Sequence, residues 1–369
     1  MRIAFIVHDY HRRGGHSRYV YELATRFARE HEVHVFATVI EGERDPRIKF
    51  HYIPSLRFSE TAGVLTFILP ATFQFLKRFD IVHAQGLCGL RQNVTTCHMC
   101  QPAWYDALKT AMGELTFKER TVQRLVQPLE KYIFQPARSK QVIAVSKLTR
   151  RNLDEYYGRK TNVTVIYHGV DLAGFHPDNR LRWRAEMRKK HDLGNDKFVV
   201  LYVGYLSKGA LPAIETIARL DGARLVLVSA TDPTPYMAFA EKFEVSSRVH
   251  FLPLSTTIER YYAMADAFLF PTVYDPFGMV VSEAMATGLP VITSSNAGAA
   301  ELIDHGLNGF VVEPAWNVTA LTSSLAQLRD DPALRERMGQ EARAKIEHFT
   351  WEDTAVETMR VYEMAAGAK

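Results

Sequence analysis

The order of apolar and amphipathic segments is the feature of this chain that most restricts its fold. Short apolar runs alternate with longer amphipathic stretches along almost the whole sequence. A short apolar run bounded by turn residues is typical of a buried strand, and an amphipathic stretch is typical of a helix that covers it. Regular alternation predicts parallel sheets with helices on both faces, the α/β class. In the first half we expect helices at 17–29 and 64–78 and strands at 3–7, 33–37, 48–53, 81–84, 94–97, 141–145 and 163–166.

The same alternation returns in the second half, which divides the chain into two domains. Strands are expected there at 198–203, 224–228, 249–251, 267–270, 290–293 and 309–311. A length of 369 residues also suits two domains of about 100–200 residues each. Glycine and proline are frequent from Tyr167 to Pro177, so we place the boundary near residue 175. Two doubly wound, Rossmann-like domains would face a cleft, and such sheets bind ligands at the carboxyl ends of their strands.

Charge is unevenly distributed along the chain. Residues 1–175 carry 25 Lys and Arg against 16 Asp and Glu, a net charge of +9, while the remainder carries −5. A basic half favours an anionic partner, such as a membrane surface or an acidic acceptor. Nucleic acid is not expected, because no arginine-rich arm or stacking motif accompanies the charge. A solvated basic face explains the excess equally well.

The N-terminus and the apolar stretches indicate a cytoplasmic protein. The run from Ile3 to Val7 is too short for a signal peptide. The longest apolar stretch, from Gly63 to Leu76, is shorter than the ~18 residues of a membrane-spanning helix. Cys97 and Cys100 form a C-x-x-C pair, and Cys88 is the third cysteine. A zinc site needs four ligands and no second pair exists, so two small buried residues are the favoured interpretation.

The densest cluster of functional residues follows the strand expected at 267–270. Seven residues lie between Asp275 and Glu283, with Asp275 in a loop and Glu283 inside the helix that begins near Gly278. The first amides of a helix have no partner within it, so they form an anion site without a metal. A carboxylate one turn deeper accepts hydrogen bonds from vicinal hydroxyls such as those of a ribose. The amides expected at this anion site are those of Phe277, Gly278, Met279 and Val280.

This segment resembles the E-x7-E signature of the family 4 retaining glycosyltransferases, which have the GT-B fold, with Asp275 in place of the first glutamate. The resemblance extends over nearly the whole chain. It implies that residues 350–369, beginning with the helix at Trp351, cross back to the first domain and that residues 176–349 bind the nucleotide-sugar. Further matching segments are Arg12–Gly15 with Arg18, Val142–Ser146, Tyr167–Asp171, Val203–Gly209 and Asn296–Gly309.

The family's site residues carry over to matching positions. Glu283 would hold the donor ribose, Asp275 would contact the sugar hydroxyls, and Lys208 would neutralise the diphosphate as it leaves. Gly14 and Gly15 would let the backbone approach the donor phosphate closely. The implied reaction transfers a sugar, from UDP by preference, to a cell-envelope glycan or a lipid-linked acceptor with retention of configuration.

The chain differs from the family pattern at two positions. Tyr205 stands where arginine is usual, with a shorter loop to Lys208, and Asp275 is one methylene shorter than the usual glutamate. No D-x-D pair occurs, so neither a metal nor another cofactor is expected, and helix amides and Lys208 would take the role of a metal. His98 follows the strand 94–97, near where the family often has a histidine or aspartate beside the reacting carbon. It is our catalytic candidate with Asp275 and Lys208, and His83 competes with it.

The stretch from Trp104 to Lys140 has basic residues interleaved with apolar ones at helical spacing. An interfacial helix on anionic lipid and an ordinary core-facing helix both fit this pattern, and the second is commoner. A peripheral position on the inner face of the membrane is therefore one open interpretation.

Four alternative functions differ from this one in what they require of the sequence. An inactive nucleotide-sugar-binding subunit would explain the changes at Tyr205 and Asp275. A GT-B sugar-nucleotide epimerase shares the fold, whereas a phosphorylase would need a pyridoxal cofactor for which no signal is present. A nicotinamide dehydrogenase would need G-x-G-x-x-G after the first strand, which Gly14 and Gly15 do not provide.

Overall fold

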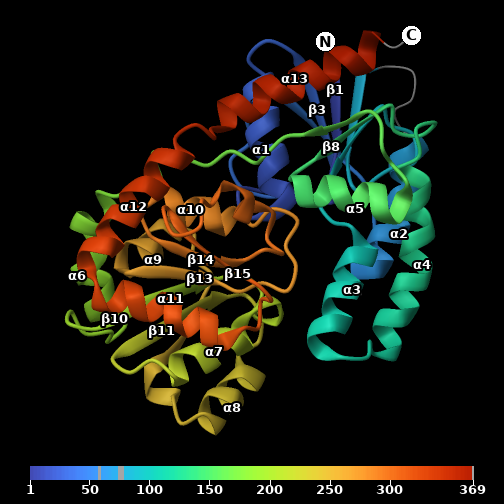
Figure 1. Ribbon diagram of the computed structural model, residues 1–369. Helices are drawn as coiled ribbons and strands as arrows, with labels where there is room; N and C mark the ends of the chain where they lie inside the picture. Colours follow the sequence, from blue (N-terminus) through green and yellow to red (C-terminus); the bar gives the residue numbers. More distant parts are fainter. Residues whose placement is uncertain (57–59, 74–78, 368–369) are drawn as a thin grey trace. The chain divides into compact units, whose positions relative to one another are not determined.

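A computed structural model describes residues 1–56, 60–73 and 79–367 of the chain. It contains two compact units, shown in Figure 1. The N-terminal unit comprises residues 1–169 together with the C-terminal segment from Trp351, and the other unit comprises Val170–Thr350. The chain therefore leaves the N-terminal unit for the first time after Gly169, whereas the sequence analysis placed this boundary near residue 175.

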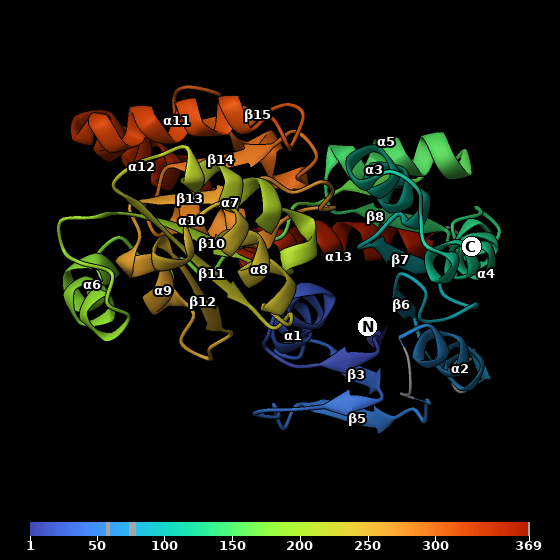
Figure 2. The same cartoon turned by 90° about the horizontal axis from the view of Figure 1, so that it is seen from below.

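The N-terminal unit contains a seven-stranded parallel sheet with the order β5-β3-β1-β6-β7-β8-β9. The order reverses between β1 and β6, which makes this pair the switch point of a doubly wound sheet. Figure 2 shows β3 and β5 side by side at one edge. The strands are β1 (Arg2–Ile6), β3 (Glu32–Ala37), β5 (Ile48–Tyr52), β6 (Ile81–Gln85), β7 (Val94–Cys97), β8 (Gln141–Ala144) and β9 (Val163–Val165), and a separate pair is β2 (Asp9–Tyr10) with β4 (Val39–Ile40).

Helices cover both faces of this sheet. Helix α13 packs against α1 and against β6, β7 and β8, so the C-terminal segment completes the N-terminal unit. An apolar cluster that includes Phe67, Ala71 and Cys88 fills another part of the core. In Figure 1, α3 and α4 lie side by side as a helical hairpin. The helices are α1 (Gly15–Phe27), α2 (Glu60–Phe73), α3 (Gln101–Met112), α4 (Phe117–Ile133), α5 (Lys147–Tyr157) and α13 (Trp351–Gly367).

The C-terminal unit contains a six-stranded parallel sheet with the order β12-β11-β10-β13-β14-β15. Its switch point is the pair β10 and β13, the two strands that precede Lys208 and Asp275. The strands are β10 (Phe198–Val203), β11 (Ala223–Ser229), β12 (Val249–Pro253), β13 (Ala267–Phe270), β14 (Val291–Ser294) and β15 (Gly309–Val312).

Right-handed crossovers put α7 and α8 on one face of this sheet and α9 and α10 on the other. The last two helices of the unit follow the same division, because α11 packs on α7 and α12 packs on α10. The elements are α6 (Asn179–Lys190), η1 (Leu206–Lys208), α7 (Ala210–Ala218), α8 (Thr234–Lys242), η2 (Ser246–Arg248), α9 (Glu259–Met264), α10 (Met279–Ala286), η3 (Gly298–Leu302), α11 (Val318–Asp330) and α12 (Pro332–Ile346).

Asp266 fixes the start of β13 beside β10. Its carboxylate accepts hydrogen bonds from Arg184 at 2.5 Å, Arg188 at 2.6 Å and the Val199 amide at 2.8 Å. Burial raises the pKa of this carboxyl, but Arg184 and Arg188 outweigh burial, so the pKa is lowered overall. The ionised aspartate therefore anchors α6 to β10 and β13, the two strands that precede Lys208 and Asp275.

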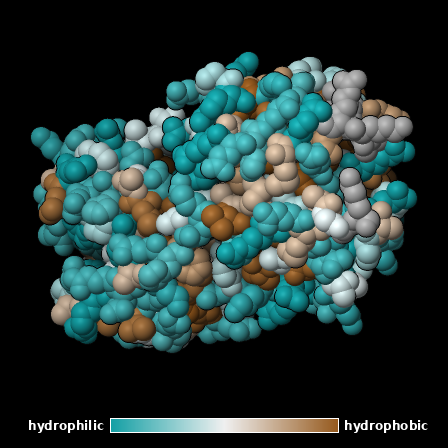
Figure 3. Space-filling model, turned by 90° about the horizontal axis from the view of Figure 1, so that it is seen from above, coloured by the Kyte–Doolittle hydropathy of each residue, from teal (hydrophilic) through white to brown (hydrophobic). Residues whose placement is uncertain are grey.

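The α/β class and the doubly wound sheets predicted from the sequence are confirmed. Every expected strand is present, and each bound lies within two residues of the expected one. The pair β2 and β4 was not anticipated, because two-residue strands have no periodicity. The helix expected at 64–78 begins earlier, at Glu60, and residues 74–78 lie outside the described part. Within the described residues, no helix is long and apolar enough to cross a membrane. The face in Figure 3 is mostly hydrophilic, with small hydrophobic patches.

Candidate donor and catalytic sites

The switch point of the C-terminal unit brings together two charged residues that are far apart in the sequence. Lys208 ends the turn after β10, and Asp275 lies in the loop between β13 and α10. Lys208 Nζ donates to Asp275 Oδ2 at 2.6 Å, and both side chains are largely buried. Two residues that the family resemblance assigned to the donor therefore form an ion pair.

Gly209 allows this close approach. An added Cβ at Gly209 would lie 2.5 Å from the Pro271 carbonyl oxygen. This contact is too short, and a backbone oxygen cannot easily move aside. The Val273 amide donates to the Lys208 carbonyl at 2.8 Å, which joins the two loops directly. Asp275 is held from its other side, since its amide donates to the Asn296 carbonyl at 2.9 Å. The lysine and the carboxylate are thus fixed by backbone contacts rather than by side-chain packing alone.

The start of α10 follows this loop and has the features of an anion site. Gly278 caps the helix with φ +87°, a conformation that favours glycine. Among the described residues, the amides of Gly278, Met279 and Val280 have no hydrogen-bond acceptor. These three N–H groups, at the positive end of the helix dipole, suit a phosphate or a sugar oxygen.

The Phe277 amide was predicted to belong to the same set, and this prediction is wrong. Its N–H donates to Asp275 Oδ1 at 3.2 Å. Aspartate commonly accepts from the amide two residues later, because its short side chain reaches back to its own loop. Asp275 therefore uses one carboxylate oxygen for Phe277 and the other for Lys208.

Glu283 lies in the first turns of α10 and is only 7% exposed. The hydroxyl of Tyr262 donates to its Oε2 at 2.8 Å. Tyr262, on α9, was not found by the sequence analysis, because nothing in the sequence distinguishes it from an ordinary core aromatic. Tyr205, at the family's arginine position, is 64% exposed and carries no charge.

In the N-terminal unit, Gly14 and Gly15 precede and begin α1. Gly14 has φ 54° and ψ 159°, a combination that only glycine adopts readily, and Gly15 has φ 59°. Both residues are exposed, and an added Cβ at either would meet nothing within 4 Å. The glycines are thus required by backbone conformation, and the space beside them is open to a ligand.

His98 directly follows β7, on the carboxyl edge of the sheet, as predicted. Its Nε2 lies 2.8 Å from Gln85 Oε1, which can only accept, so the proton is on Nε2 and Nδ1 carries a lone pair. Burial, together with the nearby His168, His16 and His83, holds the pKa of His98 well below its usual value. His98 is therefore a neutral imidazole at pH 7.

Gln85 is the last residue of β6 and was missed in the sequence. It is 4% exposed, and its Nε2 has no partner among the described residues. The signal in the sequence that could have identified Gln85 is its position as a polar residue at the end of an apolar strand, directly before Gly86. His83, proposed as an alternative to His98 at this strand end, instead lies in the middle of β6.

His83 is fully buried and both of its nitrogens are engaged. Nδ1 lies 2.7 Å from the Tyr362 hydroxyl, and Nε2 lies 2.6 Å from Thr96 Oγ1. Burial lowers the pKa of His83 to about 3. A histidine that joins β6 to α13 in this way is a structural residue, which leaves His98 as the accessible candidate of the two.

Cys97 and Cys100 are buried free thiols. Burial raises the pKa of Cys100 to about 12 and that of Cys97 well above its usual value. Neither thiol is therefore a reactive thiolate at neutral pH, which agrees with the structural interpretation.

We expect His168→Asn to make the chain less sensitive to acid. Burial and Arg18 lower the pKa of His168 to about 3, so between pH 6.5 and 3 the unfolded chain binds this proton and the folded chain does not. The stability that the neutral imidazole contributes is present above pH 6.5 and is lost as the pH falls. At pH 5.5 the loss is roughly 1.3 kcal/mol. Scanning calorimetry at pH 7.5 and 5.5 should show a gap in melting temperature about 3–5 °C narrower than that of the parent chain. An unchanged gap would contradict a buried neutral His168.

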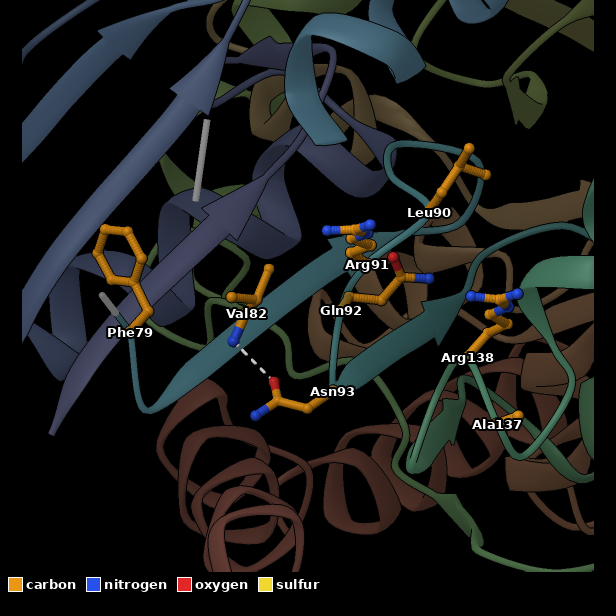
Figure 4. A pocket seen from close by; sticks show the side chains of 8 residues that line it. All are labelled: Phe79, Val82, Leu90, Arg91, Gln92, Asn93, Ala137 and Arg138. Atoms are coloured by element: carbon orange, nitrogen blue, oxygen red, sulfur yellow. Dashed lines mark hydrogen bonds between the residues drawn. The ribbon is translucent and has the colours of Figure 1, made fainter. Parts of the chain in front are cut away.

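A pocket of about 290 Å³ lies elsewhere in the N-terminal unit (Figure 4). It is formed by loops before β6, β7 and β8, at the amino edge of the sheet, and Arg91 and Arg138 are among the residues that line it. His98 and Gly14 are at the opposite, carboxyl edge. This pocket is therefore not part of the candidate site.

Comparison with known proteins identifies the fold and the family of the chain. The chain is 28% identical over 304 residues to an uncharacterized glycosyltransferase of Methanocaldococcus jannaschii, covering 78% of this chain and 76% of the relative. WaaG, a glycosyltransferase involved in lipopolysaccharide biosynthesis, superposes with a TM-score of 0.79 at 20% identity and 98% and 99% coverage. Anabaena HepE in complex with UDP-glucose gives 0.75 at 19% identity and 99% and 100% coverage. These structures establish the GT-B fold.

Two family models divide the chain between them. Residues 13–173 match glycosyltransferase family 4, and residues 184–345 match the glycosyl transferases group 1. The chain therefore belongs to the family 4 type of GT-B glycosyltransferases, and the resemblance noted in its sequence is confirmed.

Proposed function

We propose that this glycosyltransferase moves a hexosyl group from a UDP-sugar to an acceptor with retention of anomeric configuration and without a metal. The observation that carries the proposal is the arrangement at the C-terminal switch point. Lys208 and Asp275 form an ion pair there, three helix amides have no acceptor among the described residues, and Glu283 lies one turn deeper.

Each group has a role in the proposed reaction. The bond from the anomeric carbon to the diphosphate oxygen breaks, and a bond from the same carbon to the acceptor oxygen forms. Lys208 and the α10 amides neutralise the charge that develops on the leaving diphosphate. Glu283 accepts hydrogen bonds from the ribose hydroxyls. Asp275 presents Lys208 and contacts the sugar hydroxyls, and Gly14 and Gly15 give the donor phosphate access to the backbone.

His98 is proposed to contact the transferred sugar or to relay the acceptor proton. A neutral imidazole with its proton on Nε2 offers a lone pair on Nδ1, which suits acceptance of a hydrogen bond from a hydroxyl. The acceptor proton ultimately passes to the leaving phosphate oxygen or to solvent.

We expect activity with a UDP-sugar to persist in excess EDTA. The donor groups at the site are a lysine and backbone amides, so the leaving group is neutralised without a divalent cation. A panel of UDP-, GDP- and ADP-sugars, incubated with and without EDTA, should release UDP from at least one donor in both conditions. Activity that needs added Mn²⁺ or Mg²⁺ would contradict the metal-free site, and preference for another base would contradict UDP. UDP-glucose bound to HepE supports this choice of base.

The same assay tests the second function, a nucleotide-sugar-binding subunit without activity. The absence of arginine at Tyr205 is the observation that favours it, because half of the family's cationic pair is missing there. A chain that binds a UDP-sugar but never releases UDP, with any acceptor, would support this alternative. Conversion of the donor into an isomeric nucleotide-sugar would instead indicate an epimerase.

We propose a cell-envelope glycan or lipid-linked precursor as the acceptor, met at the cytoplasmic face of the membrane. The role of WaaG in lipopolysaccharide biosynthesis supports this class. Helix α4 supports the location. Phe117 is 81% exposed and Leu125 is 52% exposed, and they lie on one helix face with the exposed Arg120, Arg124 and Lys131. Exposed apolar side chains beside exposed basic ones suit a membrane surface, because the apolar groups can enter the interface while the basic groups contact anionic headgroups.

We expect the chain to bind anionic vesicles, and salt to weaken this binding. Screening over about 8 Å at physiological ionic strength reduces the attraction of exposed basic residues to lipid phosphates. Co-sedimentation with vesicles of anionic and of zwitterionic lipid measures the effect. The double variant Arg120→Ala, Arg124→Ala should lower anionic partitioning roughly tenfold or more. Equal binding to both kinds of vesicle, or no effect of the double variant, would contradict the proposed face.

A further inference from the structure

The contact between Tyr262 and Glu283 joins the donor site to a helix that the family signature does not include. Tyr262 lies on α9, within the connection from β12 to β13, and Glu283 lies on α10. The tyrosine hydroxyl donates to Glu283 Oε2 at 2.8 Å and lies 3.3 Å from the Val280 carbonyl oxygen. One hydroxyl thus contacts both the carboxylate and the backbone of the helix start.

The tyrosine ring is itself held on two sides. Tyr262 is fully buried, packs edge to face on Phe175 with ring centroids 5.3 Å apart, and stacks on Phe268 at 5.7 Å. Phe268 belongs to β13, the strand that ends at the site. A ring packed between two aromatic residues has little freedom, so its hydroxyl is a fixed donor.

A carboxylate on a glutamate side chain needs such a donor to keep one orientation. Glu283 has three rotatable bonds and is almost fully buried. A hydrogen bond to the ionised form keeps the charge in place and fixes the plane of the carboxylate. Vicinal hydroxyls bind a carboxylate well only when both of its oxygens are presented to them, so the orientation of the plane determines affinity for a diol.

We propose that Tyr262 is a positioning residue for nucleotide recognition, which orients Glu283 toward the 2′- and 3′-hydroxyls of the donor ribose. This inference rests on the proposed function, in which Glu283 holds the ribose. Tyr262 does not contact the substrate in this role. Loss of the Tyr262 hydroxyl should therefore weaken the binding only of a nucleotide that carries the 2′- and 3′-hydroxyls.

The experiment compares Tyr262→Phe with Tyr261→Phe by calorimetric titration of UDP and of 2′,3′-dideoxy-UDP. Tyr262→Phe removes one oxygen atom and keeps the ring. Tyr261 is the neighbour on α9, packs near His191 with ring centroids 5.8 Å apart and makes no hydrogen bond to Glu283 within the described residues, which makes it a matched control. We expect Tyr262→Phe to weaken UDP binding by roughly tenfold or more and to leave dideoxy-UDP binding within about twofold. Tyr261→Phe should change neither.

A double-mutant cycle separates positioning from folding. When Glu283 is replaced by glutamine, the added change Tyr262→Phe should have little further effect on UDP binding. The glutamine substitution by itself already removes the carboxylate that the Tyr262 hydroxyl orients. Equal losses for UDP and dideoxy-UDP, or additive losses in the cycle, would overturn the inference in favour of a structural role. Unchanged UDP binding by Tyr262→Phe would also overturn it. A parent chain that binds UDP and dideoxy-UDP equally would refute the ribose role of Glu283, and with it the proposed function of that residue.

Discussion

We expect Glu283→Ala to weaken UDP binding by about a hundredfold or more while the chain keeps its fold. Each hydrogen bond from a ribose hydroxyl to a buried carboxylate contributes about 1.5–3 kcal/mol, and two are lost together. The truncation also leaves the Tyr262 hydroxyl, 2.8 Å from Glu283 in the structure, without its carboxylate partner. Some loss of melting temperature is therefore expected beside the loss of binding.

Calorimetric titration with UDP at a fixed salt concentration measures this effect. Glu241→Ala on α8 is the control, since Glu241 is an exposed glutamate of the same unit. The control should titrate like the parent chain. Undiminished UDP binding by Glu283→Ala, with a normal melting curve, would exclude Glu283 from the nucleotide site.

We expect Lys208→Ala to lower kcat by about 10²–10³, the cost usual for removing one preorganised donor to a developing anion. Lys208 is the cation at the switch point, and Tyr205 supplies no second charge at the family's arginine position. Removal of the lysine also leaves the partly buried Asp275 carboxylate without its ion-pair partner. The uncompensated negative charge would repel the diphosphate, which adds to the loss.

Steady-state kinetics with the preferred donor separates the effect of the substitution on kcat from its effect on KM. A fall in kcat larger than the rise in KM indicates that Lys208 acts mainly in the transition state. Lys197→Ala is the control, because Lys197 is a partly exposed lysine of the same unit whose ammonium group pairs with the exposed Asp196. A Lys208→Ala enzyme with the parent kcat would show that the charge on the leaving group is neutralised by other residues.

The sequence alone was sufficient for the fold class, and its resemblance to a known family supplied the residues proposed for the donor site. Strands buried on both faces are apolar runs, and their helices are amphipathic, so local pattern identifies the elements. Because the carboxyl ends of parallel strands meet at one edge of a sheet, residues that follow the strands fall at one site. Lys208 and Asp275 were assigned to the donor from the family resemblance, and the structure pairs them although 67 positions separate them in the chain.

The tertiary structure decided which polar groups are already engaged. The Phe277 amide was expected to be available and is bonded to Asp275, and His83 was expected at a strand end and joins β6 to α13. The same contacts revealed Gln85 beside His98 and Tyr262 beside Glu283. Periodicity and spacing report where a residue lies along an element. They do not report which way its polar atoms point, because that depends on partners brought near only when the whole unit has packed.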